Sequence, residues 1–70
     1  MAVRQNLINK RTELGLKQRE VATKAGIKRS SYAAIERGLR TPKLETAQRI
    51  CDVLKISVSE AFPIPDEKQN

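Results

Sequence analysis

The sequence contains no histidine, no tryptophan and only one cysteine, and each absence excludes a kind of site. Without histidine, and with a lone Cys51, the chain has no histidine and cysteine ligand set for a metal ion, and no cofactor is expected. Cys51 cannot form a disulfide within the chain, which together with the lack of a signal-peptide pattern predicts a reducing, cytoplasmic setting. No apolar run approaches the roughly 18 residues of a membrane span.

Acidic residues are also few in the first part of the chain. Residues 1–43 contain 11 Lys and Arg against 3 Glu, a net charge of +8, whereas residues 44–70 have a net charge of −2. A basic front indicates a face for a polyanion. Acid–base catalysis would fall to carboxylates or lysines, and no constellation of such residues supports it, so we expect a protein that is not an enzyme.

Only three glycines are present, and the apolar spacing places each of them at the end of a helix. The pattern predicts an all-α chain without strands, whose five helices span residues 3–14, 18–24, 29–37, 43–54 and 58–62. Leu14 is expected on the apolar face of the first helix and Leu44 on the apolar stripe of the fourth. Ser57 and Glu60 have the spacing of a capping box at the start of the fifth.

The stretch 18–37 reads as two short helices joined by a tight turn. Ala22 is small enough for a close crossing of the two helices, and Gly26 tolerates the positive φ that the turn requires. The outward face of the second helix of this pair then carries a short polar surface with a cation at each end. Its residues are Arg29, Ser30, Ala33, Ala34 and Arg37. Such a face suits a DNA major groove.

These features resemble a Cro/cI-type (lambda-repressor-like, XRE-type) helix-turn-helix regulator over residues 4–62. The matching residues are Arg11, Gly15, Leu16, Gln18, Glu20, Ala22, Gly26, Tyr32, Ile35, Glu36, Gly38 and Pro42. The resemblance implies a compact five-helix domain at 1–62, with a short flexible tail at 63–70. It implies sequence-specific binding of double-stranded DNA by a stand-alone regulator, most simply a repressor, without a small-molecule ligand and without contact to a membrane.

The resemblance also assigns roles to individual residues. Base contacts are expected from Arg29, Ser30, Ala33 and Ala34. Arg29 could instead contact a phosphate, and the two alanines could either contact a thymine methyl or simply allow close approach. Phosphate contacts are expected from Lys17, Gln18, Lys28, Arg37, Arg40, Thr41 and Lys43.

Three of these lysines depart from the family pattern. Many relatives have Ser or Thr at the N-caps of the second, third and fourth helices, where this chain has Lys17, Lys28 and Lys43. Lysine cannot accept the hydrogen bond that an N-cap side chain normally accepts, and its charge faces the positive end of the helix dipole. A phosphate at these helix starts would make the placement favourable. The alternative is that the caps lie one residue away and the lysines are simply solvated.

Other residues are expected to be structural. The resemblance pairs Arg11 with Glu36 in a partly buried ion pair, although Arg11 could instead extend to solvent. Tyr32 is expected in the core with its hydroxyl at the surface, and Cys51 in the core as a small apolar residue rather than a redox sensor.

At the C-terminal end an apolar surplus remains, and the family commonly forms its dimer contact there. The residues are Val58, Phe62 and Ile64. A homodimer, at least on DNA, would bind a near-palindromic operator, although Phe62 could instead only cover the core of a monomer.

Two other functions use the same small fold. One is an antitoxin, which binds a toxin protein and its own operator, and the other is the controller of a restriction–modification system. An antitoxin is expected to have a partner-binding segment outside the helix-turn-helix, and only 63–70 is available for it.

Overall fold

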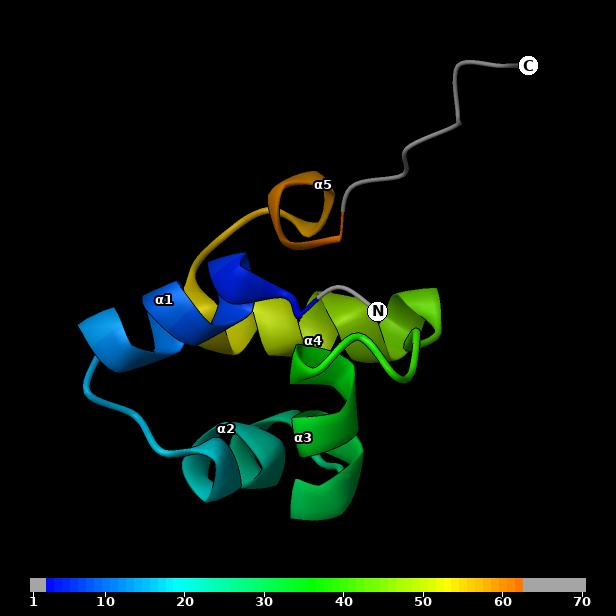
Figure 1. Ribbon diagram of the computed structural model, residues 1–70, viewed down its shortest axis with the longest axis horizontal. Helices are drawn as coiled ribbons and strands as arrows, with labels where there is room; N and C mark the ends of the chain where they lie inside the picture. Colours follow the sequence, from blue (N-terminus) through cyan, green and yellow to red (C-terminus); the bar gives the residue numbers. More distant parts are fainter. Residues whose placement is uncertain (1–2, 63–70) are drawn as a thin grey trace.

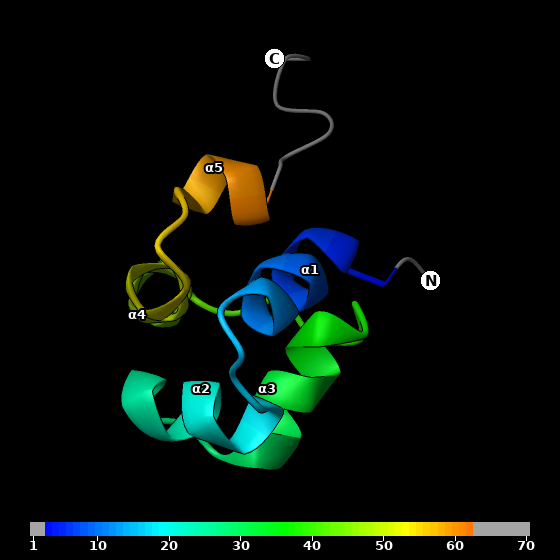
Figure 2. The ribbon, with the colours of Figure 1, turned by 90° about the vertical axis from the view of Figure 1, so that its left-hand side faces the viewer.

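Five helices joined by short turns make up the part of the chain that the computed structural model describes, residues 3–62. They are α1 (Gln5–Glu13), α2 (Gln18–Ala25), α3 (Arg29–Glu36), α4 (Leu44–Leu54) and α5 (Val58–Ala61). α1 and α4 lie in the middle, α2 and α3 pack on one side of them, and α5 packs on the other (Figure 1, Figure 2). The all-α class and the number and order of helices are confirmed.

Several helix boundaries are one or two residues shorter than predicted. α1 begins at Gln5 because Arg4, its N-cap, lies outside the helical region of φ and ψ and donates its backbone N–H to Glu36 O at 2.7 Å. α4 begins at Leu44 because Lys43 is its N-cap, with extended backbone at φ −68° and ψ 160°. α5 ends at Ala61, since Phe62 leaves the helical region at φ −129°.

The turn from α2 into α3 shows how the helices end. Gly26 adopts φ 75°, and Ile27 donates its N–H to Ala22 O at 2.9 Å, which is the hydrogen bond of a Schellman motif. Glycine takes this left-handed conformation without steric cost, so the chain reverses tightly at this position. α4 ends with the same kind of turn at Lys55, φ 60°, although no glycine marks that turn in the sequence.

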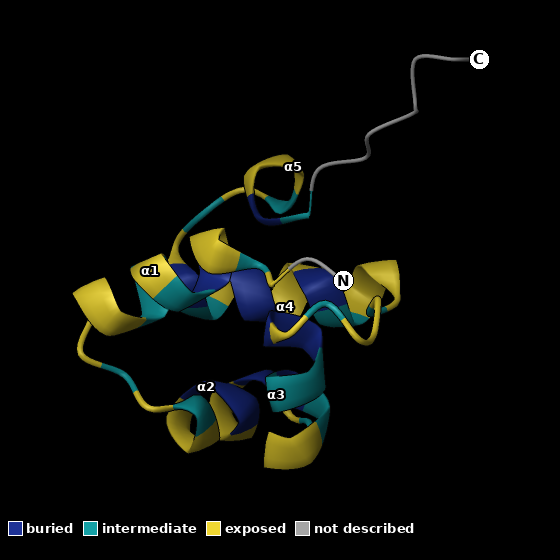
Figure 3. Ribbon diagram, in the orientation of Figure 1, coloured by how far each residue is buried: buried dark blue, intermediate teal, exposed yellow. Residues whose placement is uncertain are grey.

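The core lies where α1, α2, α3 and α4 meet, and α5 closes one end of it (Figure 3). Its buried members are Leu7, Val21, Ala22, Ala25, Tyr32, Ile35, Ile50, Cys51, Leu54 and Ala61. Cys51 is a core residue, as predicted, and burial raises the pKa of its thiol. Ala22 is buried on the face that packs against neighbouring helices, which fits its predicted place at a close crossing.

Two leucines expected on apolar stripes are not buried. Leu44 is 73% exposed, because it occupies the first position of α4, where the helix extends past the core. Leu14 is 38% exposed, because α1 has ended and Leu14 is its C-cap. Pro42 lies just before the N-cap of α4. Ser57 Oγ accepts the Glu60 N–H at 3.2 Å, which confirms the serine half of the predicted capping box.

Candidate nucleic-acid interface

The outward face of α3 is the centre of the candidate interface. Tyr32, Ile35 and Glu36 are the buried residues of this helix, so the opposite face points away from the core. Arg29, Ser30 and Arg37 are exposed, and Ala33 and Ala34 are half-buried between them. The structure therefore places the predicted base-contact residues on one face of a single helix, with an arginine at each end.

The starts of three helices carry the N-cap lysines that the sequence places there. Lys17, Lys28 and Lys43 all have extended backbone at the N-cap, and none of their side chains makes a capping hydrogen bond. The predicted cap register is confirmed. At α2 the other hydrogen bond of a capping box is present, because the Glu20 side chain accepts the backbone N–H of Lys17 at 2.7 Å.

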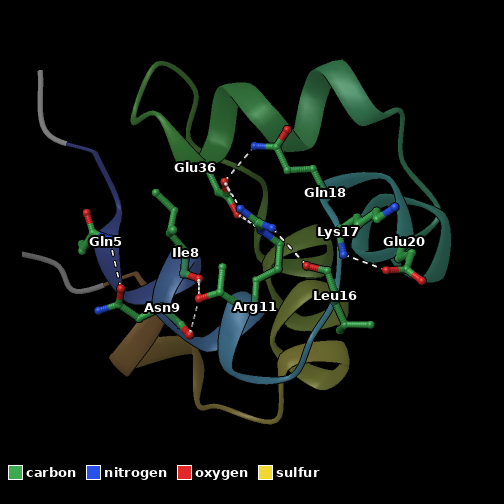
Figure 4. Close-up of polar contacts among 10 residues, drawn as sticks. Gln5, Ile8, Asn9, Arg11, Leu16, Lys17, Gln18, Glu20 and Glu36 are labelled. Carbon is green, nitrogen blue, oxygen red and sulfur yellow. Dashed lines mark hydrogen bonds and ion pairs between the residues drawn. The ribbon is translucent and has the colours of Figure 1, made fainter.

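A buried polar network joins α1, α2 and α3 behind this face (Figure 4). Arg11 Nε donates to Glu36 Oε2 at 2.6 Å, so the predicted ion pair is confirmed, with side chains that are 15% and 2% exposed. Arg11 Nη1 also donates to Leu16 O at 3.0 Å, which fixes the connection between α1 and α2. Gln18 Nε2 donates to Glu36 Oε1 at 2.8 Å.

The hydrogen bond from Gln18 to Glu36 is not predicted from the sequence, because the family resemblance gives Gln18 the role of a phosphate contact. The two assignments are compatible, because a glutamine amide carries two N–H donors and Glu36 uses one of them. The contact fixes the start of α2 against the end of α3. The spacing of a glutamine and a glutamate from different helices gives no sequence signal for such a bond.

The network sets the protonation of its members. Burial raises the pKa of Glu36, but the hydrogen bonds from Arg11 and Gln18 and the charge of Arg11 outweigh it, so the pKa lies below its ordinary value. The hydrogen bond to Glu36 raises the pKa of Arg11. Both groups are therefore charged in the folded protein at neutral pH.

Tyr32 departs from the prediction that its hydroxyl reaches the surface. The side chain is fully buried, and its hydroxyl makes no hydrogen bond within the described part of the chain. Burial raises the pKa of Tyr32, and the neighbouring Glu36 carboxylate raises it further. The hydroxyl remains inside because Tyr32 is on the inward face of α3, beside the buried pair.

On the other side of α3, the loop 39–43 carries further cations and one hydroxyl. Arg40, Thr41 and Lys43 are exposed. They lie along a groove of about 330 Å³, whose other lining residues are Ile27 from the turn before α3, Ser31 and Ile35 from α3, Pro42 from the loop and Thr46 from α4. The candidate phosphate ligands thus flank α3, with Gln18 on the side of Glu36 and the loop on the side of Ser31.

Arg4 holds this loop, although no motif in the sequence assigns it a role. Its Nη1 donates to Ile35 O at 2.7 Å and to Arg40 O at 3.0 Å, and its Nη2 donates to Thr41 Oγ1 at 3.4 Å. The guanidinium also lies over the Phe62 ring, 5.1 Å from its centroid. Arg4 belongs to no pattern in the sequence from which these contacts could be predicted, and the predicted first helix, 3–14, includes it as an ordinary helical residue.

The predicted dimer residues lie at the C-terminal end of the described chain. Val58 and Phe62 are half-buried and pack against the core, and Ile64 lies outside the described residues. Part of each described side chain is therefore used inside the monomer.

In residues 3–62 no helix is both long and apolar enough to cross a membrane. Within the same range no group of three or more potential metal ligands is brought together.

Comparisons with known proteins show the family of this chain. A helix-turn-helix family model matches residues 7–60. The chain is 36% identical over 50 residues to the cryptic phage CTXphi transcriptional repressor RstR of Vibrio cholerae, covering 71% of this chain and 45% of the repressor. It is 40% identical over 57 residues to an HTH-type transcriptional regulator of Methanothermobacter thermautotrophicus, covering 81% of this chain and 83% of that regulator. The chain thus spans about half the length of some curated relatives and most of others.

Among solved structures, the chain is similar to the restriction-modification controller protein C.AhdI from Aeromonas hydrophila. The TM-score is 0.76 at 34% sequence identity, covering 83% of this chain and 88% of that protein.

Proposed function

Because this chain belongs to the XRE-type helix-turn-helix family, we propose that it binds duplex DNA sequence-specifically and regulates transcription, with repression as its action. The observation that carries the proposal is the outward face of α3, where small residues lie between the exposed Arg29 and Arg37. An α-helix fits the major groove, and the N-terminal residues of a recognition helix usually reach the base edges. In this proposal α3 lies in the groove, α2 crosses the DNA backbone, and the protein works in the cytoplasm.

Base reading falls to the N-terminal half of α3. Arg29 donates two hydrogen bonds to O6 and N7 of a guanine, and Ser30 bonds to an adjacent base edge. Ala33 and Ala34 let the helix approach the groove floor, where a thymine methyl is the partner that their side chains fit.

Phosphate binding falls to residues on both sides of α3. Lys17, Gln18 and Lys28 lie at the starts of α2 and α3, where the positive end of the helix dipole and the lysine charge both favour an anion. After α3, the proposed phosphate ligands are Arg37, Arg40, Thr41 and Lys43. These contacts set the register of the protein on the duplex without reading sequence.

Two copies bind one operator in this proposal. Val58, Phe62 and Ile64 form the contact between them, and residues 1–62 are the DNA-binding domain; of the three contact residues, Ile64 lies outside the described residues. A two-fold axis would place the two α3 helices about 34 Å apart, one turn of DNA, and this spacing predicts a near-palindromic site.

A second candidate is the controller of a restriction–modification system. The observation that favours it is the similarity to C.AhdI, in which both chains are covered over most of their length. The two candidates share one binding mechanism and differ in the regulated gene. Selection from the genomic DNA of the host would separate them, because a controller should enrich sites ahead of a nuclease or methyltransferase gene.

Selection from a random duplex library tests the proposal. The expected result is one enriched motif with two inverted half-sites, whose centres lie about 10 base pairs apart. A parallel selection with Arg29→Ala is the control, because Arg29 is exposed and its removal should weaken enrichment without unfolding the protein. Failure to enrich any motif would refute sequence-specific binding. Co-purification of a small partner protein from the host would instead favour the antitoxin.

A further inference from the structure

Arg4 makes hydrogen bonds that connect the start of the chain to two distant segments, the end of α3 and the loop 39–43. Its guanidinium donates to carbonyl oxygens of Ile35 and Arg40 and to the hydroxyl of Thr41, which lie 31, 36 and 37 residues further along the chain. Its backbone N–H donates to Glu36 O at 2.7 Å. Arg4 is therefore fixed to the end of α3 by its backbone as well as by its side chain.

The loop depends on these contacts. Within residues 3–62, the hydrogen bonds made to residues 40–42 all come from Arg4. The planar guanidinium can donate to several acceptors at once in a fixed geometry. It joins Ile35 O, near the negative end of the α3 dipole, to the Arg40 carbonyl, so one side chain sets the distance between helix and loop.

Phe62 restricts the guanidinium from a fourth direction. The ring centroid is 5.1 Å from Arg4 Cζ, a separation at which a cation is attracted to an aromatic face. Phe62 directly follows α5 and packs against the core. The conformation of the loop is thus linked to the C-terminal end of the domain.

We propose that Arg4 is a positioning residue, which orders the loop 39–43 before DNA arrives so that Arg40, Thr41 and Lys43 meet the phosphates without a further ordering cost. This inference rests on the proposed function. When a loop becomes ordered only on binding, each side chain that is immobilised costs free energy and lowers the affinity for DNA. A loop that is already ordered does not incur this cost. Arg4 acts here through the loop and without touching the DNA.

Three substitutions test the proposal. Arg4→Met removes the charge and the donors and keeps the chain length, whereas Arg4→Lys keeps the charge and loses the planar fork. Lys10→Met is the charge-matched control, because Lys10 belongs to α1 and lines a groove with Asn6, Ile56 and Glu60, to which the loop 39–43 contributes no residue. All are compared with the parent well below the unfolding transition.

The first measurement needs no DNA. In Arg4→Met the NMR backbone order parameters of residues 39–41 should fall from the rigid value of about 0.85 to below about 0.6. In Lys10→Met they should not change. Phe62→Leu should lower them by a smaller amount. Unchanged order parameters in Arg4→Met would overturn the proposal whether or not the protein binds DNA, and an unchanged loop in Phe62→Leu would refute the link to the C-terminal end.

The second measurement is a double-mutant cycle of dissociation constants for the selected operator. Arg4→Met should weaken binding about tenfold in the parent loop, and by less than about threefold when Arg40→Ala and Lys43→Ala are already present. Arg4→Lys should bind nearly as weakly as Arg4→Met. A loss of equal size in both backgrounds would show that Arg4 contacts DNA itself or acts only on stability, and would overturn the proposal. A parent protein that binds no duplex would instead refute the proposed function.

Discussion

Glu36→Ala is the substitution whose cost the structure defines most closely. The Glu36 side chain is 2% exposed and accepts hydrogen bonds from Arg11 at 2.6 Å and from Gln18 at 2.8 Å. Alanine leaves the guanidinium of Arg11 at the edge of the core without a carboxylate, and leaves the Gln18 amide without its acceptor. The substitution therefore removes the shared partner of α1 and α2.

The magnitude follows from the exposure of the residue that remains. Removing one partner of a buried ion pair costs about 3–5 kcal/mol. Arg11 is 15% exposed and keeps its bond to Leu16 O at 3.0 Å, so water can reach part of it, and we expect the lower end, about 3 kcal/mol. Small domains have an unfolding free energy of only about 0.05–0.15 kcal/mol per residue, so this loss is a large share of the total.

Urea unfolding followed by far-UV circular dichroism measures the effect. With a slope of about 1 kcal/mol per M, the midpoint of Glu36→Ala should fall by about 3 M without a change of slope. Adding Arg11→Met should recover much of the loss, because it removes the unpaired charge and keeps the volume. A double variant no more stable than Glu36→Ala alone would refute the ion-pair account.

Three further predictions concern the interface and the pH dependence. On the selected operator, Arg29→Ala should cost about 1–3 kcal/mol and flatten the preference at one base pair, whereas Arg37→Ala should weaken all duplexes alike and lower the salt slope by about one unit. Equal losses on specific and random DNA for Arg29→Ala would make Arg29 a phosphate contact. Lys28→Ser should stabilise the free protein by about 0.5–2 kcal/mol, because serine can accept from an α3 amide, and it should weaken DNA binding with a shallower salt dependence. The corresponding serine substitutions at Lys17 and Lys43 should have the same two effects. Serine variants that bind DNA as tightly as the parent would contradict the idea that these lysines favour DNA binding at the expense of stability. The lowered pKa of Glu36 makes its stabilisation complete above the ordinary carboxylate pKa of 4.5 and lost as the pH falls through the lower folded-state pKa. In Glu36→Gln the urea midpoint should therefore depend less on pH in the acid range than it does in the parent. The same pH dependence in both proteins would contradict a role for Glu36 ionisation in stability.

The features that could be predicted from the sequence are those that local chemistry determines. Gly26 required a turn at its position, and the apolar periods on each side gave the helices, so the helix-turn-helix could be located within one residue. The lysine N-caps followed from the same boundaries. Family resemblance added the long-range pairing of Arg11 with Glu36, which no local pattern contains.

The features that could not be predicted depend on how the helices pack against one another. Leu44 fits the apolar period of α4, yet it is exposed because it is the first residue of that helix, past the core that the described residues form. Tyr32 was expected to extend its hydroxyl to solvent, but the depth of the Arg11 and Glu36 pair keeps it inside. Arg4 bonds to the end of α3 and to the loop 39–43, and Gln18 bonds to α3. Such contacts become visible only once the helices are packed.

The division of α3 into two faces has a consequence for divergence between related regulators. Tyr32, Ile35 and Glu36 hold the helix in the domain, while the remaining positions face outward or lie at the edge. Exchanges at the outward positions alter no core contact, so operator preference and folding are separable traits on a single eight-residue helix. A duplicated gene could therefore acquire a new operator through a few surface substitutions, and several such proteins could work in one cell without cross-talk while sharing one scaffold.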